Sequence, residues 1–149
     1  LFMIVEPLTG ACRVKITERR TRQDWAHVMR ELVDEHYPRA EKIVLVTDNL
    51  KTHGNASLYE TFEPAEAKRI ADKLEIHHTP KHGSWLDMAE VQLSVLSRQC
   101  LDRRIADRPT LEQEVAAWLR NHQAVPIQWR FTTKNARIKL KKLYPSLQA

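Results

Sequence analysis

The chain has 149 residues, of which 42% are hydrophobic and 29% charged, and its net charge is +5. This length suits one domain with a sizeable core, and the hydrophobic content excludes a wholly disordered chain. No apolar run approaches the ~20 residues of a membrane span and no signal sequence is evident, so we expect a soluble protein without a membrane partner. Cys12 and Cys100 lie far apart without a Cys-x-x-Cys motif, which is typical of small buried hydrophobic residues.

The first half of the chain predicts a hairpin, a helix and a buried strand. Residues 2–5 and 12–17 are expected to be strands joined by a turn at residues 7–10. Thr21 and Asp24 form a capping-box pattern that opens a helix ending before Pro38. The inward face of this helix is predicted to carry Trp25, Val28, Met29, Leu32 and Val33. The continuous apolar run at residues 42–47 favours a strand covered on both faces.

The second half continues the alternation of helices and strands. Pro64 suits the first turn of a short helix through Lys73, and residues 74–78 alternate as the next strand. From Leu86 onward the apolar residues form a broad helical stripe, and the pattern Thr110-x-x-Gln113 is expected to cap a further helix. The order of elements predicts an α/β layer arrangement.

Two carboxylates stand where a metal-dependent nuclease needs them. Asp48 follows the apolar strand, and Glu90 lies in the first turn of the helix, where the helix dipole favours an ionised carboxylate suited to a hard cation. Each acid also has a structural interpretation. Asp48 could begin a loop, and Asp87 with Glu90 could form a capping box.

Three segments carry a resemblance that favours the catalytic interpretation. They are VTDNLKTH at 46–53, HTPKHGSWLDMAE at 78–90 with SVLSRQ at 94–99, and WRFTTKNARIKLKKLYP at 129–145. Together they resemble the catalytic domain of bacterial insertion-sequence transposases in the Tc/mariner superfamily, over essentially the whole chain. The resemblance implies an α/β, ribonuclease-H-like fold with a mixed central sheet flanked by helices. We expect this partial DDE catalytic domain at residues 1–122 and a basic helical extension at 123–149, packed on the same domain.

The resemblance assigns the second Asp and the Glu of the DDE triad to Asp48 and Glu90, which would hold Mg²⁺ or Mn²⁺. Asn49, His53 and Asp87 are expected near this site. The first Asp of the triad has no counterpart, because residues 1–6 match the strand after it. We therefore expect an N-terminal truncation, a missing upstream segment as a partner, and no activity from the chain alone. Asp87 stands where the family commonly carries Asn, and an N-cap is favoured over a metal ligand.

Charge points to DNA as the partner. From Val115 to Ala149 there are seven Lys or Arg and no acid. Four of them recur at helical spacing and predict a DNA-binding face, with a solvated or membrane-surface helix as the alternative: Lys134, Arg137, Lys141 and Lys142. Lys81, His82 and Trp85 are predicted to contact DNA in the loop before Glu90, although Trp85 suits a core anchor equally well. The histidines His53, His77, His78 and His82 lack regular zinc-ligand spacing, so zinc is the minor alternative.

The resemblance implies metal-dependent DNA cleavage at element ends and strand transfer into target DNA, hence DNA transposition and recombination. It also implies a bacterial cytoplasmic, nucleoid-associated location, and it leaves a homodimer open. Two other functions stay open at this point. One is a non-enzymatic DNA-binding remnant, and the other is a ribonuclease-H-fold nuclease that performs no strand transfer.

Overall fold

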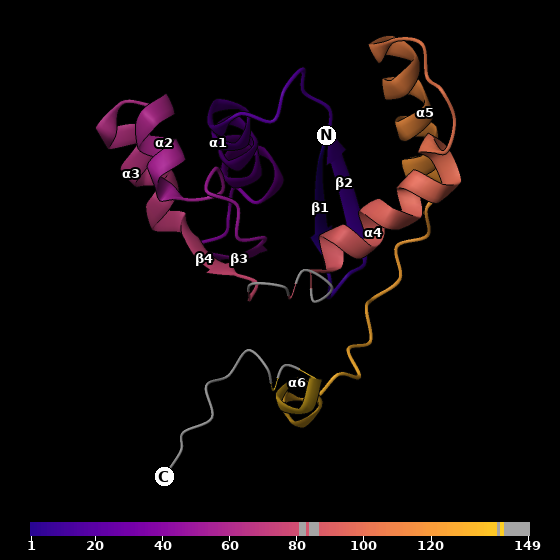
Figure 1. The fold of residues 1–149 in the computed structure, drawn as a ribbon. Helices are drawn as coiled ribbons and strands as arrows, with labels where there is room; N and C mark the ends of the chain where they lie inside the picture. The colour runs from indigo at the N-terminus through magenta and orange to yellow at the C-terminus, as the bar shows by residue number, and fades with distance from the viewer. Residues whose placement is uncertain (81–82, 84–86, 140, 142–149) are drawn as a thin grey trace.

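A β-hairpin lies between two helical layers in the computed structural model of the chain, which describes residues 1–80, 83, 87–139 and 141 (Figure 1). The strands β1 (Phe2–Glu6) and β2 (Ala11–Lys15) are antiparallel, with Phe2 opposite Lys15. This confirms the predicted hairpin, although β2 ends at Lys15 and not at residue 17. Alternate residues of β1 pack on opposite sides. Phe2 and Ile4 belong to one core cluster, and Met3 belongs to the other together with Leu1, which precedes the strand.

The larger core is built on α1 (Arg22–Glu31) and the π-helical turn η1 (Leu32–His36) that continues it. The predicted capping box is present. Thr21 Oγ1 accepts a bond from the Asp24 N–H at 3.2 Å, and Asp24 Oδ2 accepts one from the Thr21 N–H at 2.9 Å. All five predicted inward residues are buried. They pack with Phe2, Ala26, Leu58, Ala67, Ile70 and Leu74.

The second sheet consists of β3 (Ile43–Thr47) and β4 (Leu74–His78), which are parallel with Thr47 opposite His78. Between them run α2 (Asn55–Thr61) and α3 (Pro64–Lys73), since parallel neighbours need a crossover connection. The prediction that β3 is covered on both faces is wrong for the described part of the chain. Ile43 and Leu45 pack on the core, whereas Val44 and Val46 are 63% and 55% exposed.

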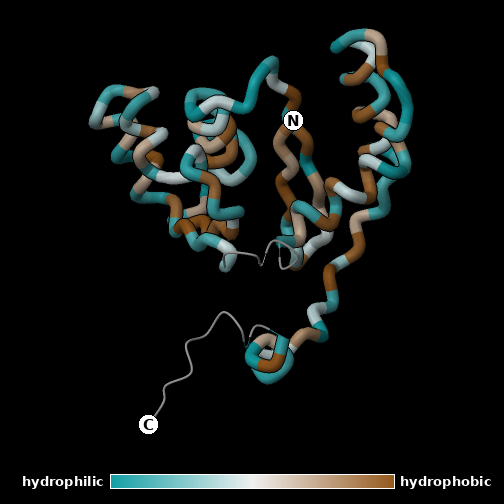
Figure 2. Tube along the Cα trace, in the orientation of Figure 1, coloured by the Kyte–Doolittle hydropathy of each residue, from teal (hydrophilic) through white to brown (hydrophobic). Residues whose placement is uncertain are grey.

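In the described part of the chain, the two sheets do not join into the expected mixed central sheet. Among the described residues, β1 pairs only with β2 and β3 pairs only with β4. Each of β1 and β3 therefore has one edge without a strand partner in that part of the chain. Both strands are apolar along most of their length, as the brown segments of Figure 2 show. The mixed α/β composition agrees with the prediction, and the sheet topology differs from it.

The second core lies on the other side of the hairpin. It is formed by α4 (Met88–Leu96), the π-helical turn η3 (Ser97–Leu101) and α5 (Arg108–Asn121), with buried Leu96, Cys100 and Val115. The predicted cap of α5 is wrong. The N-cap is Asp107, whose Oδ1 accepts from the Thr110 N–H at 2.8 Å, so the helix begins before Thr110. Cys100 is buried as expected, but Cys12 is only half-buried.

The C-terminal part leaves α5 as an extended segment and reaches α6 (Thr133–Lys139), which lies apart from the two cores in Figure 1. The extended segment contacts the turn of the β1–β2 hairpin. The Ile127 N–H donates to the Pro7 carbonyl oxygen at 2.8 Å, and the Val125 backbone lies against Gly10. Within the described residues, no helix is long and apolar enough to cross a membrane.

Candidate active site

The candidate site begins where the two parallel strands end. Because Thr47 and His78 are register partners, Asp48 and Thr79 leave β3 and β4 side by side. The Thr79 N–H donates to the Thr47 carbonyl oxygen at 2.9 Å, which extends the ladder by one bond. His78 Nδ1 lies 3.2 Å from the Asp48 carbonyl oxygen and acts as the donor, since a carbonyl only accepts. The main chain of Asp48 is thus held by the neighbouring strand.

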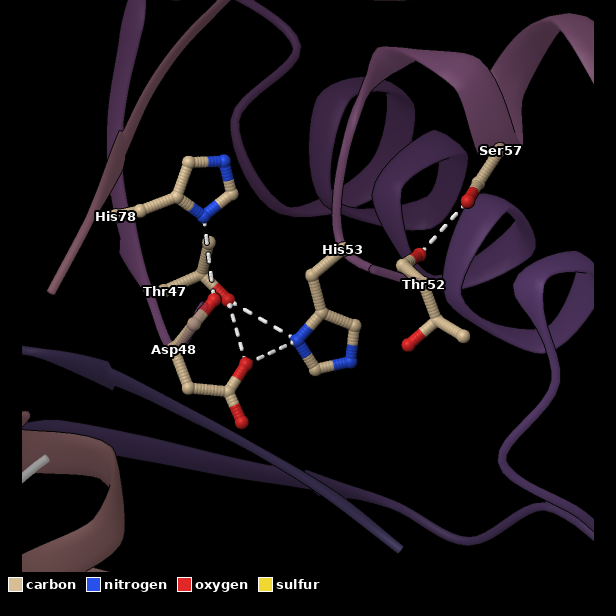
Figure 3. Close-up of polar contacts among 6 residues, drawn as sticks. All are labelled: Thr47, Asp48, Thr52, His53, Ser57 and His78. Carbon is tan, nitrogen blue, oxygen red and sulfur yellow. Dashed lines mark hydrogen bonds and ion pairs between the residues drawn. The ribbon is translucent and has the colours of Figure 1, made fainter. Parts of the chain in front are cut away.

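The Asp48 carboxyl is held from its own loop (Figure 3). His53 Nδ1 lies 2.5 Å from Asp48 Oδ1, and the Thr47 hydroxyl lies 3.4 Å from the same oxygen. The His53 side chain is 10% exposed and the Asp48 side chain 24%. Asp48 is therefore open enough to meet a ligand, while its imidazole partner is nearly buried. His53 therefore lies directly beside Asp48.

Asp87 lies within electrostatic reach of this pair. It is 7% exposed and caps α4, with Oδ1 accepting from the Ala89 N–H at 2.9 Å. Burial raises the pKa of the Asp87 carboxyl above its ordinary value, the negative charge of Asp48 raises it further, and the N–H groups of Ala89 and Glu90 oppose the shift. The cap role favoured by the sequence is present. The same carboxyl also adds negative charge beside Asp48.

Glu90 lies in the first turn of α4 and is half-buried. The metal site shared by Asp48 and Glu90 stays a prediction. Asn49 follows Asp48 and is exposed. Lys134 and Arg137 are exposed on α6, and Lys141 is exposed after it. The predicted DNA contacts Lys81, His82, Trp85 and Lys142 lie outside the described residues.

The chemistry of the donors at Asp48 fits a hard divalent cation, because such ions take oxygen ligands and the carboxyl is partly exposed. The described residues contain no group of three His, Cys, Asp or Glu side chains arranged to hold a metal ion. Zinc gains no support from the histidines. His77 Nε2 lies 2.7 Å from Glu75 Oε1 at an exposed position, while His53 and His78 both bond to Asp48.

Sequence reasoning missed two residues of this site, Thr47 and the role of His78. The signal for Thr47 was its position directly before Asp48, and the signal for His78 was its place at the end of the strand predicted to follow. Neither position alone indicated a contact, because the parallel register of β3 and β4 is what brings them together.

The chain matches the family model described as "DDE superfamily endonuclease" over residues 1–112. This range contains Asp48, His53, Asp87 and Glu90. The comparisons with curated proteins and with solved structures give no match.

Proposed function

Because the chain belongs to the DDE superfamily endonuclease family, whose domains act on DNA, we propose that it is the catalytic part of a bacterial insertion-sequence transposase of the Tc/mariner type. The observation that carries this proposal is the family match over most of the chain, combined with a partly exposed carboxylate at the end of a parallel strand. In open α/β sheets, ligands bind beyond the carboxyl ends of the strands. The proposal includes the ribonuclease-H-like fold and a bacterial, nucleoid-associated location.

Asp48 and Glu90 are the proposed ligands of Mg²⁺ or Mn²⁺. When bound, a pair of such ions activates a water or a DNA 3′-hydroxyl and stabilises the leaving oxygen. The protein residues supply position and charge. Asp48 offers a carboxyl held by His53 of its own loop, on a main chain held by His78 of β4. Glu90 offers a carboxyl at the start of α4, where the helix dipole favours the ionised form.

We also propose that the described carboxylates do not complete the catalytic set. Three acids are expected in a DDE triad, and the described residues bring no three suitable donors together. Among the described residues, β1 and β3 each pair with one strand only, which leaves an apolar edge on each that suits the addition of a further strand carrying the third acid.

DNA is the proposed substrate and partner. Exposed Lys134, Arg137 and Lys141 follow the two cores, and no Asp or Glu occurs after Glu114 to compensate them. Such a segment neutralises phosphates without reading sequence. Trp129 is 52% exposed in the same segment and offers a face for stacking on a base.

The proposal is tested by a joining assay with labelled duplex and a free DNA 3′-hydroxyl in Mg²⁺ or Mn²⁺. We expect at most trace nicking and joining from the 149-residue chain, with any product abolished in Asp48→Asn and Glu90→Gln. Robust cleavage that Glu90→Gln abolishes would contradict the incomplete triad. Nicking without joining would favour a hydrolase, and DNA binding by a chain that binds neither Mg²⁺ nor Mn²⁺ would favour a DNA-binding remnant.

A further inference from the structure

The two oxygens of the Asp48 carboxyl have different surroundings. Oδ1 lies 2.5 Å from His53 Nδ1 and 3.4 Å from Thr47 Oγ1. A carboxylate only accepts hydrogen bonds, so the imidazole carries its proton on Nδ1 and donates it, and the Thr47 hydroxyl donates as well. Among the described residues, every hydrogen bond to this carboxyl goes to Oδ1. Oδ2 is the oxygen that can meet a ligand.

His53 itself has little freedom to move. The residue is 8% exposed, and its ring stacks on Trp25 with centroids 5.9 Å apart and planes at 17°. The Phe2 ring is tilted at 49° to the imidazole, with ring centroids 6.4 Å apart. Its backbone N–H donates to the Leu50 carbonyl oxygen at 3.0 Å. The imidazole is therefore fixed by β1, by α1 and by its own loop.

A hydrogen bond from the start of α2 holds the main chain next to His53. The hydroxyl of fully buried Ser57 donates to the Thr52 carbonyl oxygen at 2.7 Å (Figure 3). The loop from Asp48 to His53 is thus tied at both ends, since His78 bonds to the Asp48 carbonyl oxygen. A charge-assisted bond between a fixed imidazole and a carboxylate at a loop end holds the carboxylate in one orientation before any ligand arrives.

We propose that His53 is a positioning residue for Asp48: its Nδ1–H holds Oδ1 so that Oδ2 is presented to a divalent cation. This inference rests on the proposed function, because it assumes that Asp48 binds a metal. Residues that orient a metal ligand are worth about 10–100-fold in metal affinity. His53 acts through Asp48 and needs no contact with the metal or the DNA.

The test is Mn²⁺ affinity of the whole 149-residue chain, measured from the free Mn²⁺ signal in electron paramagnetic resonance. Two substitutions separate the stacking of the His53 ring from its role as a hydrogen-bond donor. His53→Phe keeps a ring to stack on Trp25 but has no donor, and His53→Asn has no ring but places an amide N–H where Nδ1 stands. Asp48→Asn serves as the control for the metal site, and thermal unfolding of each variant shows whether it folds.

We expect His53→Phe to weaken Mn²⁺ binding by about tenfold or more, and His53→Asn to stay close to the wild type. Equal affinity in His53→Phe and wild type, with binding abolished in Asp48→Asn, would overturn the positioning role and leave the metal site intact. Equal weakening in both His53 variants would show that packing on Trp25 matters and the donor does not. Mn²⁺ binding that is absent from the wild type, or unchanged in Asp48→Asn, would overturn the proposed metal site and this inference with it.

Discussion

Gly10→Ala should loosen the C-terminal segment from the hairpin, because Gly10 has a left-handed backbone and lies against the backbone of Val125. Its φ of +75° is a backbone conformation that L side chains rarely adopt, and a Cβ there would lie 2.2 Å from the Val125 carbonyl oxygen. Ordinary contact begins at 3.4 Å, so the segment must retreat by more than 1 Å. The neighbouring bond from the Ile127 N–H to Pro7 is 2.8 Å long and would be broken by such a shift.

The expected decrease in unfolding free energy follows from two contributions. A left-handed backbone costs a residue with a Cβ roughly 1–2 kcal/mol, and breaking the hydrogen bond adds about 1 kcal/mol. The variant should therefore be roughly 2–3 kcal/mol less stable in urea denaturation. The Ile127 amide should also exchange faster with deuterium, because its bond to the hairpin turn is broken.

Gly54→Ala is the matched control. A Cβ at Gly54 meets nothing within 4 Å, and its φ of −170° is ordinary extended backbone. Since Gly54 is the N-cap of α2, replacement by Ala should cost less than about 1 kcal/mol and leave Ile127 exchange unchanged. The reasoning is refuted if the two alanine variants are destabilised equally, or if Gly10→Ala leaves the Ile127 amide protected as in the wild type.

Two further predictions concern charge. Neutralising Lys134, Arg137, Lys141 and Lys142 together should weaken duplex binding and lower its salt slope by about 1 for each phosphate that the variant no longer neutralises. Asp48→Asn should leave the affinity for duplex unchanged or raise it. An unchanged salt slope in the fourfold variant would mean that these basic residues form only a solvated surface. The pKa of Asp87 is raised in the native state, whereas in the unfolded state this carboxyl loses its proton near the ordinary pKa of 3.8. Ionisation of Asp87 therefore makes the fold less stable as pH rises from that value through the raised native pKa. Asp87→Asn keeps the helix cap and removes this destabilisation. In urea titrations, the unfolding free energy of the variant relative to wild type should therefore increase from about pH 3 to about pH 7. A difference in unfolding free energy that stays constant over this range would contradict a raised pKa of Asp87.

Local signals predicted most of the helices and strands, because their causes lie within a few residues. The capping box of Thr21 and Asp24 fixes the start of α1, and Pro64 fixes that of α3. The prediction of the α5 cap was wrong for a local reason as well, since Asp107 and Thr110 are both residue types that cap helices and lie three residues apart. The short helix α2 went unpredicted, and its N-cap Gly54 has no side chain to signal a helix start.

The pairing of the strands and the contacts within the site could not be predicted as fully as the helices and strands themselves, because both depend on contacts between residues far apart in the sequence. The apolar run of β3 indicates that the strand can be buried on both faces, but exposure of Val44 and Val46 depends on which other element covers them. Likewise, Asp48 could be identified from its position after a strand, whereas its bond to His53 requires the imidazole to be seated on Trp25 of α1.

The packing of His53 links the core of the protein to the chemistry of the candidate site. Trp25 is 2% exposed and belongs to the core around α1, and it also forms the surface on which the Asp48 partner stacks. Protein interiors are packed so closely that a change of a single methylene affects neighbouring side chains. The orientation of the Asp48 carboxyl therefore depends on core side chains such as Trp25, which do not contact a ligand. A carboxylate at the end of a strand can have many roles, and here the buried imidazole behind it distinguishes it from an ordinary loop residue such as exposed Asn49. That distinction is physical, since a nearly buried histidine directed at a partly exposed acid restricts the acid without blocking its second oxygen.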